Sequence, residues 1–207
     1  DICELIPSGA LSYQKSLRSL VWKICLKYLS SNIEDWESYL EKKREEYQDI
    51  KDKYLTTSKN LKKKFSPSMD ILSDNKMSYF FKDNKILELI EKDMKRTYPN
   101  ISFFQEKSKN NKKENNCDVL KRLLFIYSKK YPDISYVQGL NLIISNIFYV
   151  FSKDENPFFN LYAEEDTFFC FELLLKNFKD IYNQEKDKSE KGIKSIINYI
   201  KLWFFHK

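Results

Sequence analysis

The spacing of apolar residues is the feature that most constrains how this chain can fold. Apolar residues recur at steps of three and four, as on the buried face of a helix, and no run alternates apolar with polar residues as a half-buried strand does. Three glycines and five prolines in 207 residues are also too few for the frequent turns of a sheet protein. The sequence therefore predicts an all-α, multi-helix fold, and its 42% of hydrophobic residues can form a substantial core.

The helical pattern predicts several helices separated by polar segments. The expected helices cover residues 16–30, 35–54, 84–96, 118–131, 138–152, 163–178 and 192–205. The expected loops cover the polar residues 56–68, the low-complexity residues 105–116, which we expect to form a mobile surface loop, and residues 183–191. The run 140–151 is apolar nearly all round, so it predicts a helix in the middle of the fold, and it is shorter than the about 20 residues that cross a bilayer.

Charge and cysteine usage say little about function. Lysine and arginine outnumber acidic residues by 36 to 30, which favours acidic partners such as a phosphate-bearing protein, anionic lipid or nucleic acid. Lysine and asparagine are abundant, a bias that base composition of the coding DNA also produces, so a solvated basic surface is the simpler interpretation. The four cysteines, Cys3, Cys25, Cys117 and Cys170, form no C-x-x-C pair, which is typical of a reducing, intracellular compartment, and we expect the protein in the cytoplasm.

Several kinds of chemistry are excluded by the residues that are missing. No two glycines are close enough for a glycine-rich phosphate loop, so we expect no self-contained nucleotide hydrolysis. The one histidine, His206, stands at the end of the sequence, which argues against a catalytic triad and a multi-histidine zinc site. We therefore expect neither a bound metal nor a cofactor on this chain.

One arginine and one glutamine remain in suggestive settings. Asp93 and Arg96 are spaced i, i+3 near a helix end, so the carboxylate can aim the guanidinium, although such a pair is also an ordinary feature of a helix C-terminus. Gln138 and Gly139 precede the long apolar run; the glutamine can act chemically or simply satisfy backbone groups, and the glycine can make room for another molecule or for a close helix contact. Taken singly, neither the pair Asp93 and Arg96 nor the pair Gln138 and Gly139 decides between a chemical role and an ordinary structural one.

Two motifs and three flanking segments resemble one protein family. "IEKDMKRTYP" (90–99) resembles the I-x-x-D-x-x-R-T-[FY]-P motif of TBC domains, the GTPase-activating domains for Rab proteins, and "YVQGLN" (136–141) resembles their Y-x-Q-G-[ML]-N motif. The flanking segments "SLRSLVW", "LLFIYSKKYPDISY" and "EEDTFFCFELLL" also match the family in the right order. Two departures are Ser135, where glycine is usual, and an insertion rich in asparagine and lysine after the arginine motif.

The resemblance covers nearly the whole chain and implies both the fold and the bounds of the domain. It implies that residues 1–207 are a single TBC domain that is all-helical and lacks the C-terminal helices of the family. The chain begins at Asp1, and its last predicted helix is still strongly apolar at Lys207. We therefore expect an excised segment whose final helix packs against a partner beyond that residue.

The resemblance also implies a mechanism and a partner. Arg96 would be an arginine finger and Gln138 a glutamine finger, both inserted into the nucleotide site of a Rab-family GTPase in its GTP form, which itself carries the GTP and Mg²⁺. The supporting residues would be Asp93, which orients Arg96, Gly139, which lets the loop approach closely, and the motif residues Tyr136 and Thr97. The chain would thus be a GTPase activator that acts in trans.

Two other functions compete with this one. A catalytically silent TBC module could bind a GTPase or another trafficking protein as a scaffold, but the chain keeps both finger residues. A helical nucleic-acid-binding domain could use the lysines at 62–64 and 107–113, but these are not interleaved with aromatic residues. Peripheral attachment to endomembranes through other regions of the parent protein is left open.

Overall fold

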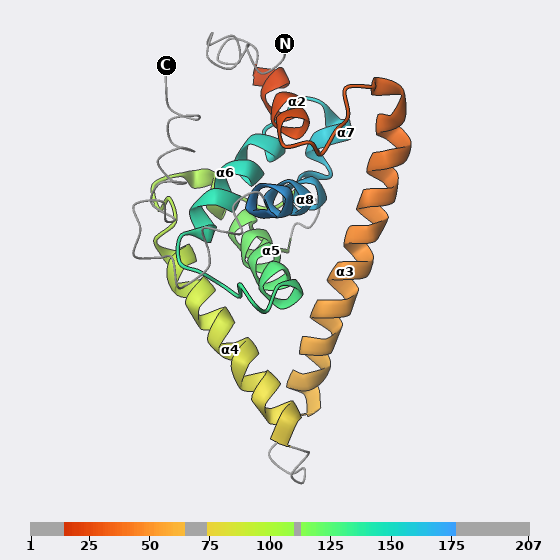
Figure 1. Cartoon of the computed structure of the whole chain (residues 1–207). Helices are drawn as coiled ribbons and strands as arrows, with labels where there is room; N and C mark the ends of the chain where they lie inside the picture. The colour runs from red at the N-terminus through yellow and green to blue at the C-terminus, as the bar shows by residue number, and fades with distance from the viewer. Residues whose placement is uncertain (1–14, 65–73, 110–112, 177–207) are drawn as a thin grey trace, which may run out of the picture. The chain divides into compact units, whose positions relative to one another are not determined.

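The structure, a computed structural model, describes residues 15–64, 74–109 and 113–176, and within these ranges it is helical (Figure 1). The α-helices are α2 (Lys15–Cys25), α3 (Trp36–Lys64), α4 (Asp74–Lys95), α5 (Asn116–Lys130), α6 (Leu140–Ser152), α7 (Pro157–Asn160) and α8 (Ala163–Lys176). Two short 3-10 helices, η2 (Ile33–Asp35) and η3 (Ser102–Gln105), join them. The prediction of an all-α fold is confirmed.

The described residues fall into two compact units. One unit contains residues 15–42 and 142–176, and the other contains residues 43–64, 74–109 and 113–141. The boundary falls inside α3 and near the start of α6. That residues 1–207 form a single domain stays a prediction.

A buried ion pair lies at the centre of the first unit. Lys23 Nζ on α2 lies 2.8 Å from Asp166 Oδ2 on α8, and neither side chain is exposed to solvent. The Lys23 ammonium also lies over the ring of Phe159, 4.1 Å from its centroid, and the Tyr28 hydroxyl donates to Asp166 Oδ1 at 3.0 Å. A buried charge is tolerated only when it is paired and hydrogen-bonded, so this cluster specifies how α2 and α8 meet.

The turn at the end of α2 places the Tyr28 side chain in that cluster. The helix stops at Cys25, and Lys27 adopts a left-handed backbone with φ of 61°. Two backbone bonds follow the Schellman pattern, in which Lys27 N–H donates to Ile24 C=O at 2.9 Å and Tyr28 N–H donates to Lys23 C=O at 2.8 Å. The sequence predicted a helix as far as residue 30, but Tyr28 is buried because the chain turns there rather than because the helix continues.

Two other predicted boundaries were wrong. The helix expected over residues 35–54 continues to Lys64, so most of the lysine-rich segment 56–68 that we predicted as a loop is helical. The helix expected from residue 84 begins at Asp74. The segment 56–64 is polar and lacks a clear apolar stripe, so the hydrophobic pattern did not reveal that it is helical.

Helix α5 is the core of the second unit, where it packs against α4 and η3. A capping box starts α5, because Asn115 Oδ1 accepts from Asp118 N–H at 2.8 Å while Asp118 Oδ2 accepts from Asn115 N–H at 3.3 Å. One face of the helix is buried through the residues Val119, Leu120, Leu123, Leu124, Ile126 and Tyr127. Lys129 Nζ contacts Asp83 Oδ1 on α4 at 2.6 Å, which fixes α5 against α4.

Backbone hydrogen bonds join the two described ends of the low-complexity segment 105–116 to each other. Lys107 and Asn115 form an isolated antiparallel bridge, and Ser108 N–H donates to Glu114 C=O at 2.9 Å. Asn116 N–H donates to Glu106 C=O at 3.0 Å. Backbone pairing therefore holds the described ends of the segment together, and the expectation of a mobile surface loop stays a prediction.

Some predictions lie outside the described residues. These are the loop at 183–191, the helix at 192–205, His206 and Cys3. Among the residues that the structure describes, Cys25, Cys117 and Cys170 form no disulfide, and Cys170 is buried in α8, where a thiol packs as a small hydrophobic group. None of the described helices is both long enough and apolar enough to span a lipid bilayer.

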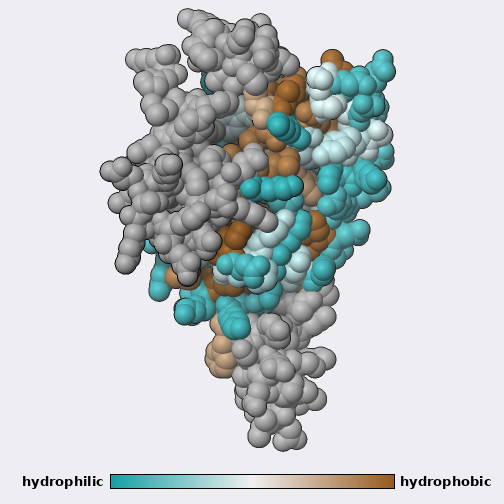
Figure 2. Space-filling model, in the orientation of Figure 1, coloured by the Kyte–Doolittle hydropathy of each residue, from teal (hydrophilic) through white to brown (hydrophobic). Residues whose placement is uncertain are grey.

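Apolar side chains also reach the described surface. The face shown in Figure 2 mixes hydrophilic areas with apolar ones. The large hydrophobic residues with more than a third of their surface exposed are Leu17, Ile33, Tyr39, Phe81, Leu89, Ile101, Tyr149, Phe158, Leu161 and Tyr162. Apolar atoms are common on protein surfaces, so single exposed residues of this kind need no special function.

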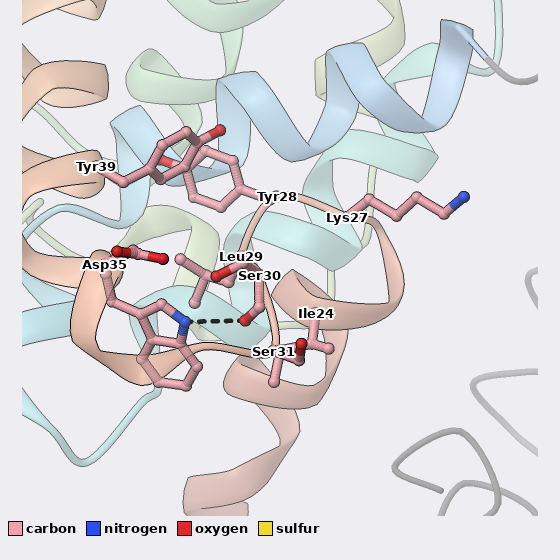
Figure 3. A pocket seen from close by; sticks show the side chains of 9 residues that line it. Ile24, Lys27, Tyr28, Leu29, Ser30, Ser31, Asp35 and Tyr39 are labelled. Carbon is pink, nitrogen blue, oxygen red and sulfur yellow. Dashed lines mark hydrogen bonds between the residues drawn. The ribbon is translucent and has the colours of Figure 1, made fainter.

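A cavity of about 630 Å³ lies in the first unit, between the end of α2 and the start of α3 (Figure 3). Its lining includes the rings of Tyr28 and Tyr39, whose centroids are 5.8 Å apart, and Figure 3 shows Lys27 extending away from them. The Trp36 indole N–H donates to Ser30 C=O at 2.9 Å and closes one side. The cavity contains none of the residues that the sequence predicts for function.

The buried ion pair generates a stability prediction. We expect Asp166→Ala to lower the free energy of unfolding by about 3–5 kcal/mol, because the substitution leaves the buried Lys23 ammonium without its ion-pair partner and the Tyr28 hydroxyl without its acceptor. As a control, Glu46→Ala removes the partly exposed pair of Lys43 and Glu46 on one helix and should cost about 1 kcal/mol or less. Urea unfolding measures both values, and equal losses in the two variants would contradict the central role of the buried pair.

Candidate functional site

The end of α4 positions Arg96. The helix ends at Lys95, and its last turn tightens, since Arg96 N–H donates to Asp93 C=O at 3.1 Å. Arg96 Nη2 donates to Asp93 Oδ1 at 2.6 Å, while 59% of the arginine side chain but only 6% of the aspartate side chain is exposed. A buried carboxylate thus holds one side of a guanidinium whose other donors face solvent.

A turn before α6 positions Gln138. Ser135 N–H donates to Tyr131 C=O at 2.8 Å, and Ser135 has a φ of 56°. Gln138 is exposed, Gly139 follows it with a φ of 103°, and α6 begins at Leu140. The sequence predicted Gln138 within the start of this helix, but the structure places it in the turn before the first helical residue.

Tyr136 connects the two segments through Asp93. The buried Tyr136 hydroxyl donates to Asp93 Oδ2 at 2.7 Å, so the carboxylate accepts from Arg96 with one oxygen and from Tyr136 with the other. Burial raises the pKa of Tyr136, and its hydrogen bond to Asp93 raises that pKa further. Tyr136 is therefore neutral near pH 7 and remains a hydrogen-bond donor to the carboxylate.

Asn141 makes a second connection between the same segments. Its Nδ2 donates to Thr97 Oγ1 at 2.7 Å, and its Oδ1 accepts from Gly139 N–H at 3.1 Å. The Thr97 hydroxyl in turn donates to Asp93 C=O at 2.7 Å, which satisfies a carbonyl at the helix end. We refer to residues 93–98 as the arginine segment and to residues 135–141 as the glutamine segment.

Left-handed backbone conformations occur in both segments. Tyr98, two residues after Arg96, has a φ of 44°, and its ring stacks on Phe104 with centroids 5.7 Å apart. Ser135 has a φ of 56°, a conformation that glycine adopts more readily than serine. Non-glycine residues adopt such angles only when the surrounding contacts hold them, so the hydrogen bonds around Tyr98 and Ser135 are needed to keep this backbone.

The structure thus connects most of the residues that the sequence singled out. Asp93, Thr97, Tyr136 and Gly139 belong to one hydrogen-bond network, and Arg96 joins it through Asp93. Asn141 belongs to the same network, and sequence reasoning did not select it. The available signal was a polar residue inside an apolar run, in the last position of the "YVQGLN" motif.

The network has the features of a site that acts on another molecule. No group of three or more potential metal ligands occurs among the residues the structure describes. The chemically active groups that reach solvent are a guanidinium and a carboxamide, which donate and accept hydrogen bonds without giving up a proton near pH 7. Such groups suit the stabilisation of charge and the orientation of a small molecule such as water.

Comparison with known proteins identifies the family. A family model described as the Rab-GTPase-TBC domain matches residues 15–204. The chain belongs to the Rab-GTPase-TBC domain family. The match includes both the arginine segment and the glutamine segment, as the motif resemblance predicted.

Relatives and a solved structure agree with this family. The human protein "TBC1 domain family member 13" is 30% identical over 92% of this chain, and yeast "GTPase-activating protein GYP1" from Saccharomyces cerevisiae is 26% identical over 89% of it. The crystal structure of the Ypt/Rab-GAP domain of Gyp1p superposes with a TM-score of 0.61 and 26% identity, covering 90% of this chain and 55% of that chain. The chain spans 64% of the length of the human relative.

The left-handed positions in the glutamine segment generate a pair of opposite predictions. We expect Gly139→Ala to lower the free energy of unfolding by about 1–2 kcal/mol, because a Cβ is unfavourable at a φ of 103°. Ser135→Gly should instead raise it by up to about 1 kcal/mol, because glycine adopts a φ of 56° without strain. Chemical unfolding of both variants tests the signs, and a stabilised Gly139→Ala variant would contradict the described backbone.

Proposed function

We propose that this chain is a GTPase-activating module that accelerates GTP hydrolysis by a Rab-family GTPase, with Arg96 and Gln138 supplied in trans. Family membership supports the class of partner, since the family is named for Rab GTPases. The observation that carries the proposal is the hydrogen-bond network that ties the arginine segment to the glutamine segment. In this proposal the partner GTPase carries the GTP and the Mg²⁺, and the chain contributes side chains only.

Arg96 would stabilise the charge that develops during phosphoryl transfer. Negative charge grows on the β–γ bridging oxygen and the γ-phosphoryl oxygens as GTP is cleaved, and a planar guanidinium offers several aligned donors to it. Asp93 occupies only one side of the guanidinium, at 2.6 Å, so the remaining N–H groups can reach another molecule. The buried carboxylate would also limit the directions in which the long arginine side chain can move.

Gln138 would orient the attacking water. A carboxamide both accepts and donates hydrogen bonds and carries no charge, so it can hold a water in line with the γ-phosphorus without competing for the phosphate charge. Gln138 is exposed in its turn, and the neighbouring Gly139 adds no Cβ that would hinder a close approach of the partner. In this proposal Gln138 substitutes for the glutamine of the GTPase itself.

A binding module without activity would have no need for this arrangement. A scaffold requires a complementary surface, but it does not require a positioned guanidinium and a carboxamide on two connected segments. The network involves the buried side chains of Asp93, Thr97 and Asn141, and burying polar groups is unfavourable unless every one of them is bonded. The arrangement therefore favours an activator over a silent scaffold.

The proposal predicts a large loss of activity in two single variants. We expect Arg96→Ala to lower the single-turnover rate of GTP hydrolysis by on the order of 10³-fold or more, because a finger supplied in trans contributes 10³ to 10⁵ in rate. Arg96→Lys should recover little, because lysine lacks the planar fork of donors. Gln138→Ala should lose a comparable part of the acceleration, and both variants should still bind the GTP-loaded Rab.

Matched controls separate the fingers from general effects on the surface. Lys95→Ala removes an exposed positive charge next to Arg96, and Gln105→Ala removes an exposed glutamine from η3; both should stay within a few-fold of the unchanged chain. The assay is single-turnover GTP hydrolysis by a panel of GTP-loaded Rabs incubated with each variant. If Arg96→Ala or Gln138→Ala retains full activity on an accepted Rab, that residue has no part in the reaction.

A further inference from the structure

Asn141 occupies a distinctive place in the hydrogen-bond network. Only 4% of this residue is exposed, and each end of its side-chain amide contacts a different segment. The Nδ2 atom donates to Thr97, the residue directly after Arg96, and the Oδ1 atom accepts from the N–H of Gly139, the residue directly after Gln138. The side chain thus bridges the immediate neighbours of both proposed fingers.

We infer that Asn141 is a positioning residue that sets the geometry of Arg96 and Gln138 together. The inference rests on the proposed function, since it assigns a role within that same site. Asn141 is buried rather than presented to a partner, and in this inference it acts through Thr97 and Gly139. Loss of its amide would release both fingers at once, although no finger atom is removed.

The chemistry of the amide explains why asparagine is suited to this place. The Nδ2 group needs an acceptor and finds Thr97 Oγ1 at 2.7 Å, while Oδ1 accepts from Gly139 N–H at 3.1 Å and lies 3.4 Å from the Tyr136 hydroxyl. Aspartate would lack the donor and would add a second buried carboxylate near Asp93. An apolar residue would leave the part-buried Gly139 N–H without its acceptor and the buried Thr97 hydroxyl without its donor, and unpaired polar groups that are shielded from water are costly.

The backbone conformation next to the Asn141 side chain makes the two segments sensitive to the loss of that side chain. Gly139 has a φ of 103° and Tyr98, which follows Thr97, has a φ of 44°, so both bridged residues adjoin or occupy left-handed conformations. A non-glycine residue such as Tyr98 keeps such a conformation only where neighbouring contacts hold it, whereas glycine adopts it readily. Without the Asn141 amide the arginine segment loses a contact beside Tyr98 and the Gly139 N–H loses its acceptor, so both segments can shift and carry the neighbouring finger away from its reactive position.

Asn141→Ala tests the inference against a merely structural role. We expect the maximum single-turnover rate at a saturating concentration of the variant to fall about 10- to 100-fold, the size of loss that a displacement of about 1 Å can cause. The half-saturating concentration should change little. A role in stability alone predicts the reverse, because a partly unfolded population raises the half-saturating concentration and leaves the maximum unchanged.

Asn116 provides a matched control. It is also a buried asparagine, 5% exposed, and its Nδ2 donates to Phe103 C=O at 2.9 Å. Asn116→Ala removes a buried amide and its hydrogen bond from the same unit without touching Thr97 or Gly139. We expect this variant to have a lower unfolding midpoint and an unchanged maximum rate.

Substitutions at Thr97 test the other end of the bridge and remain informative if Asn141→Ala does not fold. Thr97→Val removes the hydroxyl that accepts from Asn141 and should lower the maximum rate as Asn141→Ala does. Thr97→Ser keeps a hydroxyl and should recover most of that loss. The double variant of Thr97→Val with Asn141→Ala should be no slower than the slower single variant, because both remove the same contact.

The outcomes separate this inference from the proposed function. A wild-type maximum rate in Asn141→Ala or in Thr97→Val overturns the inference, provided that the unchanged chain accelerates hydrolysis on the Rab used and Arg96→Ala does not. Strictly additive losses in the double variant overturn it as well. If the unchanged chain accelerates no Rab in the panel, or Arg96→Ala is as active as the unchanged chain, the proposed function fails and the inference fails with it.

Discussion

The carboxylate of Asp93 is the interaction on which the site depends. One oxygen accepts from the exposed Arg96 guanidinium and the other accepts from the buried Tyr136 hydroxyl, so a single side chain links a helix end to the turn that carries Gln138. The backbone carbonyl of the same residue accepts from Thr97, which leads through Asn141 to Gly139. A mobile surface side chain could not join so many groups, and burial is what holds Asp93 in place.

The two units use buried charge in different ways. In the first unit Lys23 and Asp166 are both fully buried, and their pair determines how α2 and α8 pack. In the second unit only the acidic partner is buried, while 59% of the Arg96 side chain stays exposed. A fully buried pair is suited to specifying structure, whereas a half-exposed pair leaves donors available to a second molecule.

The sequence predictions succeeded where neighbouring residues determine the structure, and they failed where distant residues do. Strong apolar stripes revealed α5, α6 and α8, but the polar stretch that ends α3 carries no such stripe and was missed. The acidic residues Glu164, Glu165 and Asp166 suit the start of a helix, yet the structure buries all three. Their burial depends on residues such as Lys23, which lies far away along the chain.

The sequence by itself determined the all-helical class and the family, and it is the source of the proposal that Arg96 and Gln138 act on a phosphoryl group. Periodicity and residue chemistry are local properties, so motifs and spacing are enough to reveal them. Only the tertiary structure decided that Asn141 bridges the two motifs and that Ser135 is left-handed. The Asn141 side chain reaches a residue 44 positions away, and helix packing rather than any local pattern brings such groups within hydrogen-bonding distance.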